Sequence, residues 1–146
     1  MYKFLFARST LFLLFGIITL LQVFSFPGQF SHMRKVEGFS LLQQVILTGI
    51  VALLLLSAQF SIFCIWKIVG YMEHNCFFSL EAFGWVDRLV RTLKWATLFP
   101  LTLIVVVAPQ ADDPGVLVLL VAISLFVFST FLIASLLRDQ IQMKVQ

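Results

Sequence analysis

Apolar residues occur in four long runs separated by short polar segments. A helix needs about 20 apolar residues, with a range near 17 to 25, to cross the hydrocarbon core of a bilayer. The first, second and fourth runs contain no charged residue. The pattern predicts an all-α, polytopic membrane protein with four transmembrane helices, at about residues 9–26, 41–66, 90–108 and 116–137.

The third run differs because an amphipathic stretch leads into it. From Ser79 onward, at 100° per residue, apolar side chains fall on one half of a helical wheel and charged ones on the other. Ser79 is placed to cap this helix, and Glu81 in the first turn suits the helix dipole. The uncharged residues 95–108 span only about 21 Å of a core of about 30 Å. The membrane is therefore expected to accept the helix from about residue 90, with Arg91 and Lys94 snorkelling to the headgroups.

Turn-forming residues mark the connections between the runs. We expect loops at residues 27–40 and 67–78 and an acidic turn at residues 109–115. Pro100 predicts a kink inside the third span. The tail, residues 138–146, is expected to continue the last helix or to fray.

Composition places the chain outside the soluble range. Its 146 residues are 61% hydrophobic and 12% charged, whereas soluble domains are about half apolar and about a quarter charged. A single membrane domain over residues 1–146 is expected, with no separate soluble one. The first run resembles a signal peptide, but no small-x-small cleavage site follows it, so an uncleaved span is expected. The net charge of +3 comes from bases at span ends, which does not predict direct nucleic-acid binding.

The distribution of lysine and arginine predicts the orientation. Both termini, the second connection and the start of the third helix hold eight of these residues, and the opposite connections hold two, Arg34 and Lys35. Because cytoplasmic segments retain basic residues, both termini are expected in the cytoplasm. The three tryptophans and two tyrosines fall at the same predicted boundary, as in an aromatic belt.

Polar side chains inside the spans indicate packing more than transport. Ion transport through lipid usually needs an ionisable residue within a span, and only Arg91 and Lys94, at the entry to the third, meet this condition. Gln59 lies within the second span and is expected to hydrogen-bond to a neighbouring helix, a contact worth about 0.6 to 2 kcal/mol. A pore-lining role for Gln59 is the less favoured alternative.

No combination of residues predicts a catalytic, cofactor or metal site. His32 and His74 lie in opposite connections, and Glu73, His74 and Cys76 are fewer than the four ligands of a structural zinc site. Cys64 and Cys76 are expected to be buried, inert thiols near the cytoplasm. The chain is therefore not predicted to be an enzyme.

Three pieces of the amphipathic stretch form a motif: Phe78-Ser79, Ala82-Phe83 and Trp85-Val86-Asp87. With them the chain resembles a bacterial four-helix membrane family catalogued as domain of unknown function 2975, particularly its actinobacterial-type members. The resemblance implies four spans in the bacterial inner membrane and no assigned activity. Genes of the family often lie beside one for a small helix-turn-helix regulator, which implies a membrane partner that holds or releases a transcription factor. Supporting matches are Pro27-Gly28-Gln29-Phe30, Asp113-Pro114-Gly115 and Leu136-Leu137-Arg138.

Three hypotheses explain the amphipathic helix. It lies on the inner leaflet and sets the entry angle of the third span, with an Asp87–Arg91 pair at i,i+4 adding a few tenths of a kcal/mol. Alternatively it docks a cytosolic protein, or its bases bind anionic lipid at about 1 kcal/mol each. The expected surface for a partner or lipid comprises Phe78, Ser79, Trp85, Asp87, Arg88, Arg91 and Lys94.

The function predicted from these features is interaction or regulation at the inner membrane without catalysis. A cytosolic helix-turn-helix regulator is the expected partner, beside the lipid bilayer itself. Two alternatives stay open: an accessory transporter subunit or small carrier formed by homo-oligomerisation, and a structural protein that responds to lipid or envelope stress.

Overall fold

The structure, a computed structural model, describes residues 2–25, 28, 32, 35 and 40–145. Almost all of these residues are helical. The helices are α1 (Tyr2–Leu20), the π-helical η1 (Leu21–Ser25), α3 (Leu41–Glu73), α4 (Leu80–Ala96), α5 (Leu98–Val107), the 3-10 helix η2 (Ala108–Gln110) and α6 (Pro114–Val145). Pro27, Gln29, Phe30 and Arg34 of the expected first connection lie outside the described residues.

Within the described residues, four helical segments are long and apolar enough to cross a membrane. The prediction of an all-α, multi-pass membrane protein is thereby confirmed. The segments are Tyr2–Phe24, Leu41–Glu73, Leu80–Val107 and Pro114–Val145.

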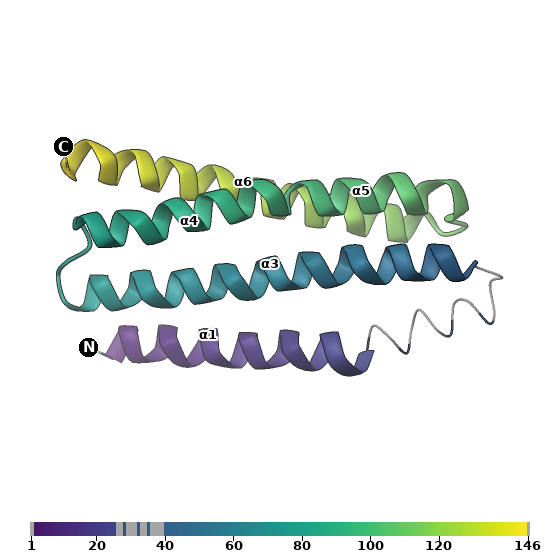
Figure 1. Cartoon of the computed structure of the whole chain (residues 1–146), viewed down its shortest axis with the longest axis horizontal. Coiled ribbons are helices and arrows are strands. Elements are labelled where there is room, and N and C mark those ends of the chain that lie inside the picture. The colour runs from purple at the N-terminus through teal and green to yellow at the C-terminus, as the bar shows by residue number, and fades with distance from the viewer. Residues whose placement is uncertain (1, 26–27, 29–31, 33–34, 36–39, 146) are drawn as a thin grey trace.

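The helices run side by side along one long axis (Figure 1). α4 packs between α3 and α6, α5 packs against α6 and α3, and α1 lies along α3. Both chain termini and the α3–α4 connection lie at the same end of the bundle, which we call the terminal end (Figure 1). This is the arrangement that an even number of spans requires.

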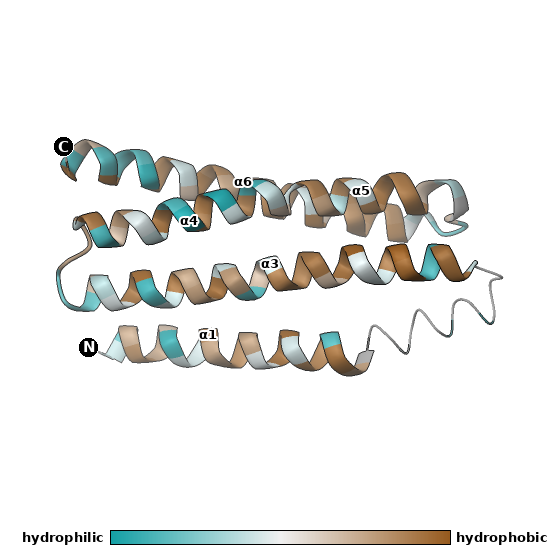
Figure 2. Ribbon diagram, viewed as in Figure 1, coloured by the Kyte–Doolittle hydropathy of each residue, from teal (hydrophilic) through white to brown (hydrophobic). Residues whose placement is uncertain are grey.

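The terminal end extends beyond the thickness of a bilayer core. α3 has 33 residues and α6 has 32, so at 1.5 Å per residue each is about 50 Å long, against a core of about 30 Å. Figure 2 shows hydrophilic residues concentrated on α4 and on the last turns of α6, while α5 and the middle of α3 are hydrophobic. We therefore place the surplus length at the terminal end.

The core of the bundle is centred on α4. Of the side chains predicted to share its apolar face, Ala82, Val86, Leu89, Val90 and Leu93 are buried, and Phe83 and Trp85 are half-buried. Four of the buried ones, Val86, Leu89, Val90 and Leu93, form one cluster with Cys64 and Ile68 of α3 and Ala134 and Ile141 of α6. Neighbouring helices cover this apolar face. The face is therefore not turned toward the inner leaflet, as one hypothesis for the amphipathic helix expected.

The second connection is shorter than predicted because α3 continues to Glu73. The helix ends in a Schellman motif, in which the Cys76 N–H donates to the Tyr71 carbonyl at 2.9 Å and the Asn75 N–H to the Met72 carbonyl at 3.2 Å. Asn75 adopts the left-handed conformation this motif needs, with φ 55°. The loop predicted from residue 67 was therefore wrong as far as Glu73.

Local chemistry sets the ends of α4. The Ser79 side chain accepts a 3.2 Å hydrogen bond from the Ala82 N–H, so the predicted cap is confirmed. α4 stops at Ala96 and α5 begins at Leu98. In a continuous helix the Pro100 ring would clash with the carbonyl of Ala96, four residues earlier. The predicted irregularity in the third span thus occurs at Thr97.

Candidate functional site

Asp87 joins α4 to α6. Its Oδ1 atom accepts a hydrogen bond from Arg138 Nη1 at 3.3 Å, and its Oδ2 atom accepts one from Arg91 Nη2 at 2.6 Å. The predicted Asp87–Arg91 pair is confirmed. Because two arginines of the same chain neutralise this carboxylate, Asp87 and Arg91 are less available to a partner than the sequence suggests.

Two cations and a second aromatic ring contact the ring of Trp85. The guanidinium carbon of Arg88 is 4.6 Å from the centre of the Trp85 ring, and the Lys67 ammonium of α3 is 5.9 Å from it. Phe63 of α3 makes an edge contact with a centroid distance of 5.7 Å. Cations at such distances from an aromatic face are attracted by its quadrupole, so Arg88 is held on the outside of the bundle in a defined place.

Phe78 and Lys144 form a similar pair at the outermost turn. The Lys144 ammonium of α6 lies 4.4 Å from the centre of the Phe78 ring. Phe78 is half exposed, and Ser79 beside it is engaged in capping. The sequence did not single out Lys144, because nothing in its spacing indicates that the end of α6 reaches the start of α4.

Polar contacts join α1 to α3 at two levels of the bundle. At the terminal end, Arg8 Nη2 lies 3.1 Å from Glu73 Oε2, and its guanidinium carbon is 5.9 Å from the Trp66 ring. Deeper in the bundle, Gln59 Nε2 donates a 2.9 Å hydrogen bond to Thr19 Oγ1. Gln59 therefore hydrogen-bonds to a neighbouring helix, as the sequence predicts.

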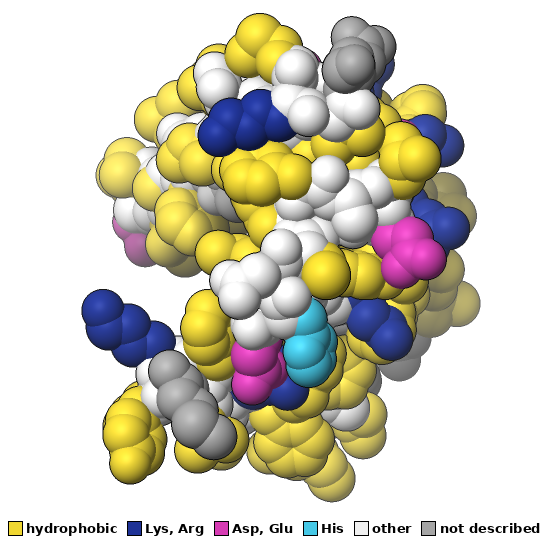
Figure 3. Space-filling model, turned by 90° about the vertical axis from the view of Figure 1, so that its left-hand side faces the viewer, with side chains coloured by type: hydrophobic (Ala, Val, Ile, Leu, Met, Phe, Trp, Pro, Cys, Tyr) yellow, Lys and Arg dark blue, Asp and Glu magenta, His cyan; other side chains and the backbone are white. Residues whose placement is uncertain are grey.

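The contacts at the terminal end define one level along the bundle axis. Where the four apolar runs end, Arg8 meets Trp66, Lys67 meets Trp85, and Asp87 meets Arg138. We call these residues the charged layer and place the membrane boundary there. Figure 3 looks onto this end and shows basic, acidic and hydrophobic side chains interspersed across it.

Arg91 and Lys94 lie on the membrane side of the charged layer. Arg91 has a side chain that is 71% exposed and reaches back to Asp87, one turn earlier. Lys94 is also exposed. The surface predicted from the sequence therefore divides into an outer part, with Phe78, Trp85 and Arg88, and a part beyond the charged layer, with Arg91 and Lys94.

Polar groups in the described part of the chain are arranged for packing. In that part no group of three or more His, Cys, Asp and Glu side chains is placed to hold a metal ion. Ser124, Thr130 and Ser135 of α6 each donate to the carbonyl one turn earlier in their own helix. Cys64 is buried as predicted, but Cys76 is exposed, because the α3–α4 connection leaves it on the surface.

The family model described as Protein of unknown function (DUF2975) matches residues 10–143. The chain belongs to this family. No match was found among the curated proteins or the solved structures. The matched region includes both Trp85-Val86-Asp87 and Leu136-Leu137-Arg138, so the Asp87–Arg138 pair brings together two motif pieces on which the family resemblance rests.

Proposed function

We propose that this member of the family binds a cytosolic protein at the terminal end of its bundle and has no catalytic activity. The binding surface comprises Phe78, Trp85, Arg88 and Lys144, and we call it the outer surface. The main support for the proposal is that both cations of this surface, Arg88 and Lys144, lie over aromatic rings. Neither forms an ion pair with a carboxylate among the described residues.

Such a surface suits an acidic partner. Arginine and aromatic side chains dominate the energetics of protein interfaces when they are held in place before binding. The inner face of α4 is packed against α3 and α6, which fixes the position of the helix that carries Trp85 and Arg88. Opposite charge on the partner would accelerate encounter and fix the orientation of docking.

A small helix-turn-helix regulator is the partner class that the family resemblance favours. Docking to the outer surface would hold such a regulator at the membrane, and release would return it to the cytoplasm. This proposal requires both termini to be cytoplasmic, as the distribution of basic residues predicts.

The carrier hypothesis receives less support from the geometry. Gln59, which would line a path, bonds to Thr19 instead. The hydroxyl groups of α6 bond to their own helix. These groups are already occupied, which leaves them less suited to solvate a passing solute.

Co-purification tests the proposal. The tagged chain is isolated in a gentle detergent, and bound proteins are identified by mass spectrometry. We expect one stoichiometric cytosolic partner, lost in the Arg88→Glu/Lys144→Glu double variant. Arg91 is left intact because its reversal would also break the pair with Asp87.

Lys3→Glu is the matched control, since it reverses an exposed charge at the same end of the bundle on α1. It should retain the partner, and all variants should insert into the membrane. Unchanged recovery from the double variant, or equal loss from Lys3→Glu, would exclude the outer surface as the docking site.

A further inference from the structure

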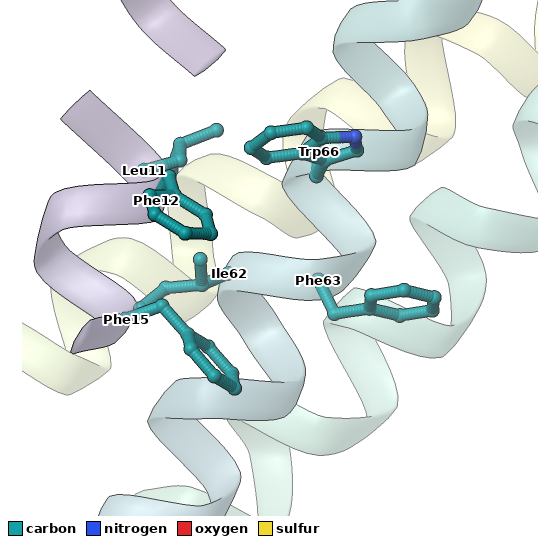
Figure 4. A pocket seen from close by; sticks show the side chains of 6 residues that line it. All are labelled: Leu11, Phe12, Phe15, Ile62, Phe63 and Trp66. Atoms are coloured by element: carbon teal, nitrogen blue, oxygen red, sulfur yellow. The ribbon is translucent and has the colours of Figure 1, made fainter. Parts of the chain in front are cut away.

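A groove with a volume of about 240 Å³ runs between α1 and α3, just on the membrane side of the charged layer. Figure 4 shows α1 side chains on one side of it and α3 side chains on the other. The groove lies within two candidate membrane spans, so its surroundings are acyl chains. It is lined by Leu11, Phe12, Phe15, Ile62, Phe63 and Trp66.

Two cations rest on aromatic walls of this groove. The guanidinium carbon of Arg8 is 5.9 Å from the Trp66 ring, and the Lys67 ammonium is 5.7 Å from the Phe63 ring. Arg8 is paired with Glu73. No carboxylate among the described residues pairs with Lys67. Its ammonium also lies 5.9 Å from the Trp85 ring of α4, so this uncompensated positive charge stands at the α4-facing edge of the groove, beside Phe63.

Trp66 suits the mouth of a lipid site. Its indole nitrogen lies at the end of the ring farther from α1 (Figure 4). Tryptophan at a membrane boundary keeps its ring in apolar surroundings while its N–H bonds to headgroup oxygens. The groove thus offers hydrocarbon contacts along its length, with a donor and a cation at the headgroup level.

We propose that the groove binds a phospholipid with an anionic headgroup. One acyl chain lies against Ile62 and the α1 phenylalanines, and the phosphate group lies beside Lys67 and the Trp66 N–H. Charge complementarity favours an anionic lipid over a zwitterionic one. A space of this size fits an acyl chain, whereas a helix of a second copy, about 10 Å across, could place only side chains in it.

Native mass spectrometry tests this site with Arg88 and Lys144 of the outer surface unchanged, and its readout is retained lipid and not a bound protein. The full chain in mild detergent is incubated with vesicles containing equal amounts of phosphatidylglycerol and phosphatidylcholine. We expect each chain to retain one phosphatidylglycerol molecule, about fivefold more often than phosphatidylcholine. This is the preference that one cation beside an anionic headgroup provides. Lys67→Gln should bring this ratio close to one while a lipid is still retained.

Lys94→Gln is the control, since it removes an exposed cation of α4 away from the groove and should leave the preference intact. Ile62→Trp, which fills the groove, should lose both lipids. Equal retention of both lipids by the wild type, or equal effects of Lys67→Gln and Lys94→Gln, would overturn the proposal. A dimer without lipid that Ile62→Trp disrupts would assign the groove to a second copy.

Discussion

Arg138 Nη1 lies 3.3 Å from Asp87 Oδ1 and joins the end of the apolar run of α6 to the middle of α4. The two side chains are 36% and 28% exposed, so water screens their attraction only in part. Asp87 also holds Arg91 of its own helix. One carboxylate therefore organises the polar side of α4 at the level where the helices leave the bilayer.

Asp87→Asn should destabilise the bundle by about 1–2 kcal/mol, between the values for exposed and buried ion pairs. The loss leaves Arg138 without its α4 partner. Unfolding in detergent measures the change, and Arg91→Gln, which removes only the more exposed pair, should cost a few tenths of a kcal/mol. In a double-mutant cycle Asp87→Asn and Arg138→Gln should couple; strictly additive effects would show that the contact contributes no stability.

Ile141→Ala should cost about 2–5 kcal/mol, the usual range for truncating a fully buried side chain. Ile141 is 0% exposed although it lies in the polar tail, because α6 continues and packs against α4. Thermal unfolding measures the loss. The exposed neighbour Met143 provides the comparison, and Met143→Ala should change stability by less than about 0.5 kcal/mol. Similar small effects at both positions would mean that the tail is frayed.

Gln59→Leu should loosen α1 from α3 and lower stability by about 0.6–2 kcal/mol, the range for hydrogen bonds between membrane helices. Thr19→Val removes the other half of the same bond and should have a similar effect. The double variant should be only slightly less stable than either single variant, because each substitution alone already breaks the bond. A double variant as costly as the sum would point to separate roles, and loss of solute flux in proteoliposomes with Gln59→Leu would revive the carrier hypothesis.

The features that the sequence predicts well are those that depend on neighbours along the chain. Long apolar runs predict the four spans because a bilayer core has a fixed thickness. The buried face of α4 and the Ser79 cap follow from helical period and from one hydroxyl before the first turn. The break at Thr97 follows from a single proline three residues later.

The features that it does not predict depend on contacts between distant segments. Residues 67–73 carry charges and resemble a loop, yet they stay helical because they pack beside α4 and end in a motif built on Asn75 rather than glycine. The pairs Asp87–Arg138 and Arg8–Glu73 join residues that no spacing rule relates. The groove between α1 and α3 depends on how two helices pack, which single-chain periodicity does not specify.

Cys76 should report the orientation of the terminal end. It is exposed in the α3–α4 connection, whereas Cys64 is buried. A membrane-impermeant maleimide should therefore label Cys76 in inside-out vesicles but not in intact spheroplasts, and Cys64 only after unfolding. Cys76→Ser should abolish the labelling. Labelling of Cys76 in intact spheroplasts would place the outer surface outside the cell and exclude a cytosolic partner.

Photo-crosslinking in cells tests docking at the outer surface directly. Gly84 lies one turn from Arg88 on the same side of α4, and apart from its own stretch of helix nothing lies within 4 Å of a Cβ built there. A benzophenone side chain at this position leaves every proposed contact residue in place. Gly16 of α1 is equally open and serves as the matched control within a span. We expect position 84 to capture one cytosolic protein, with the adduct lost on Arg88→Glu and absent from position 16. No protein adduct at position 84, or the same adduct from position 16, would contradict docking at the outer surface.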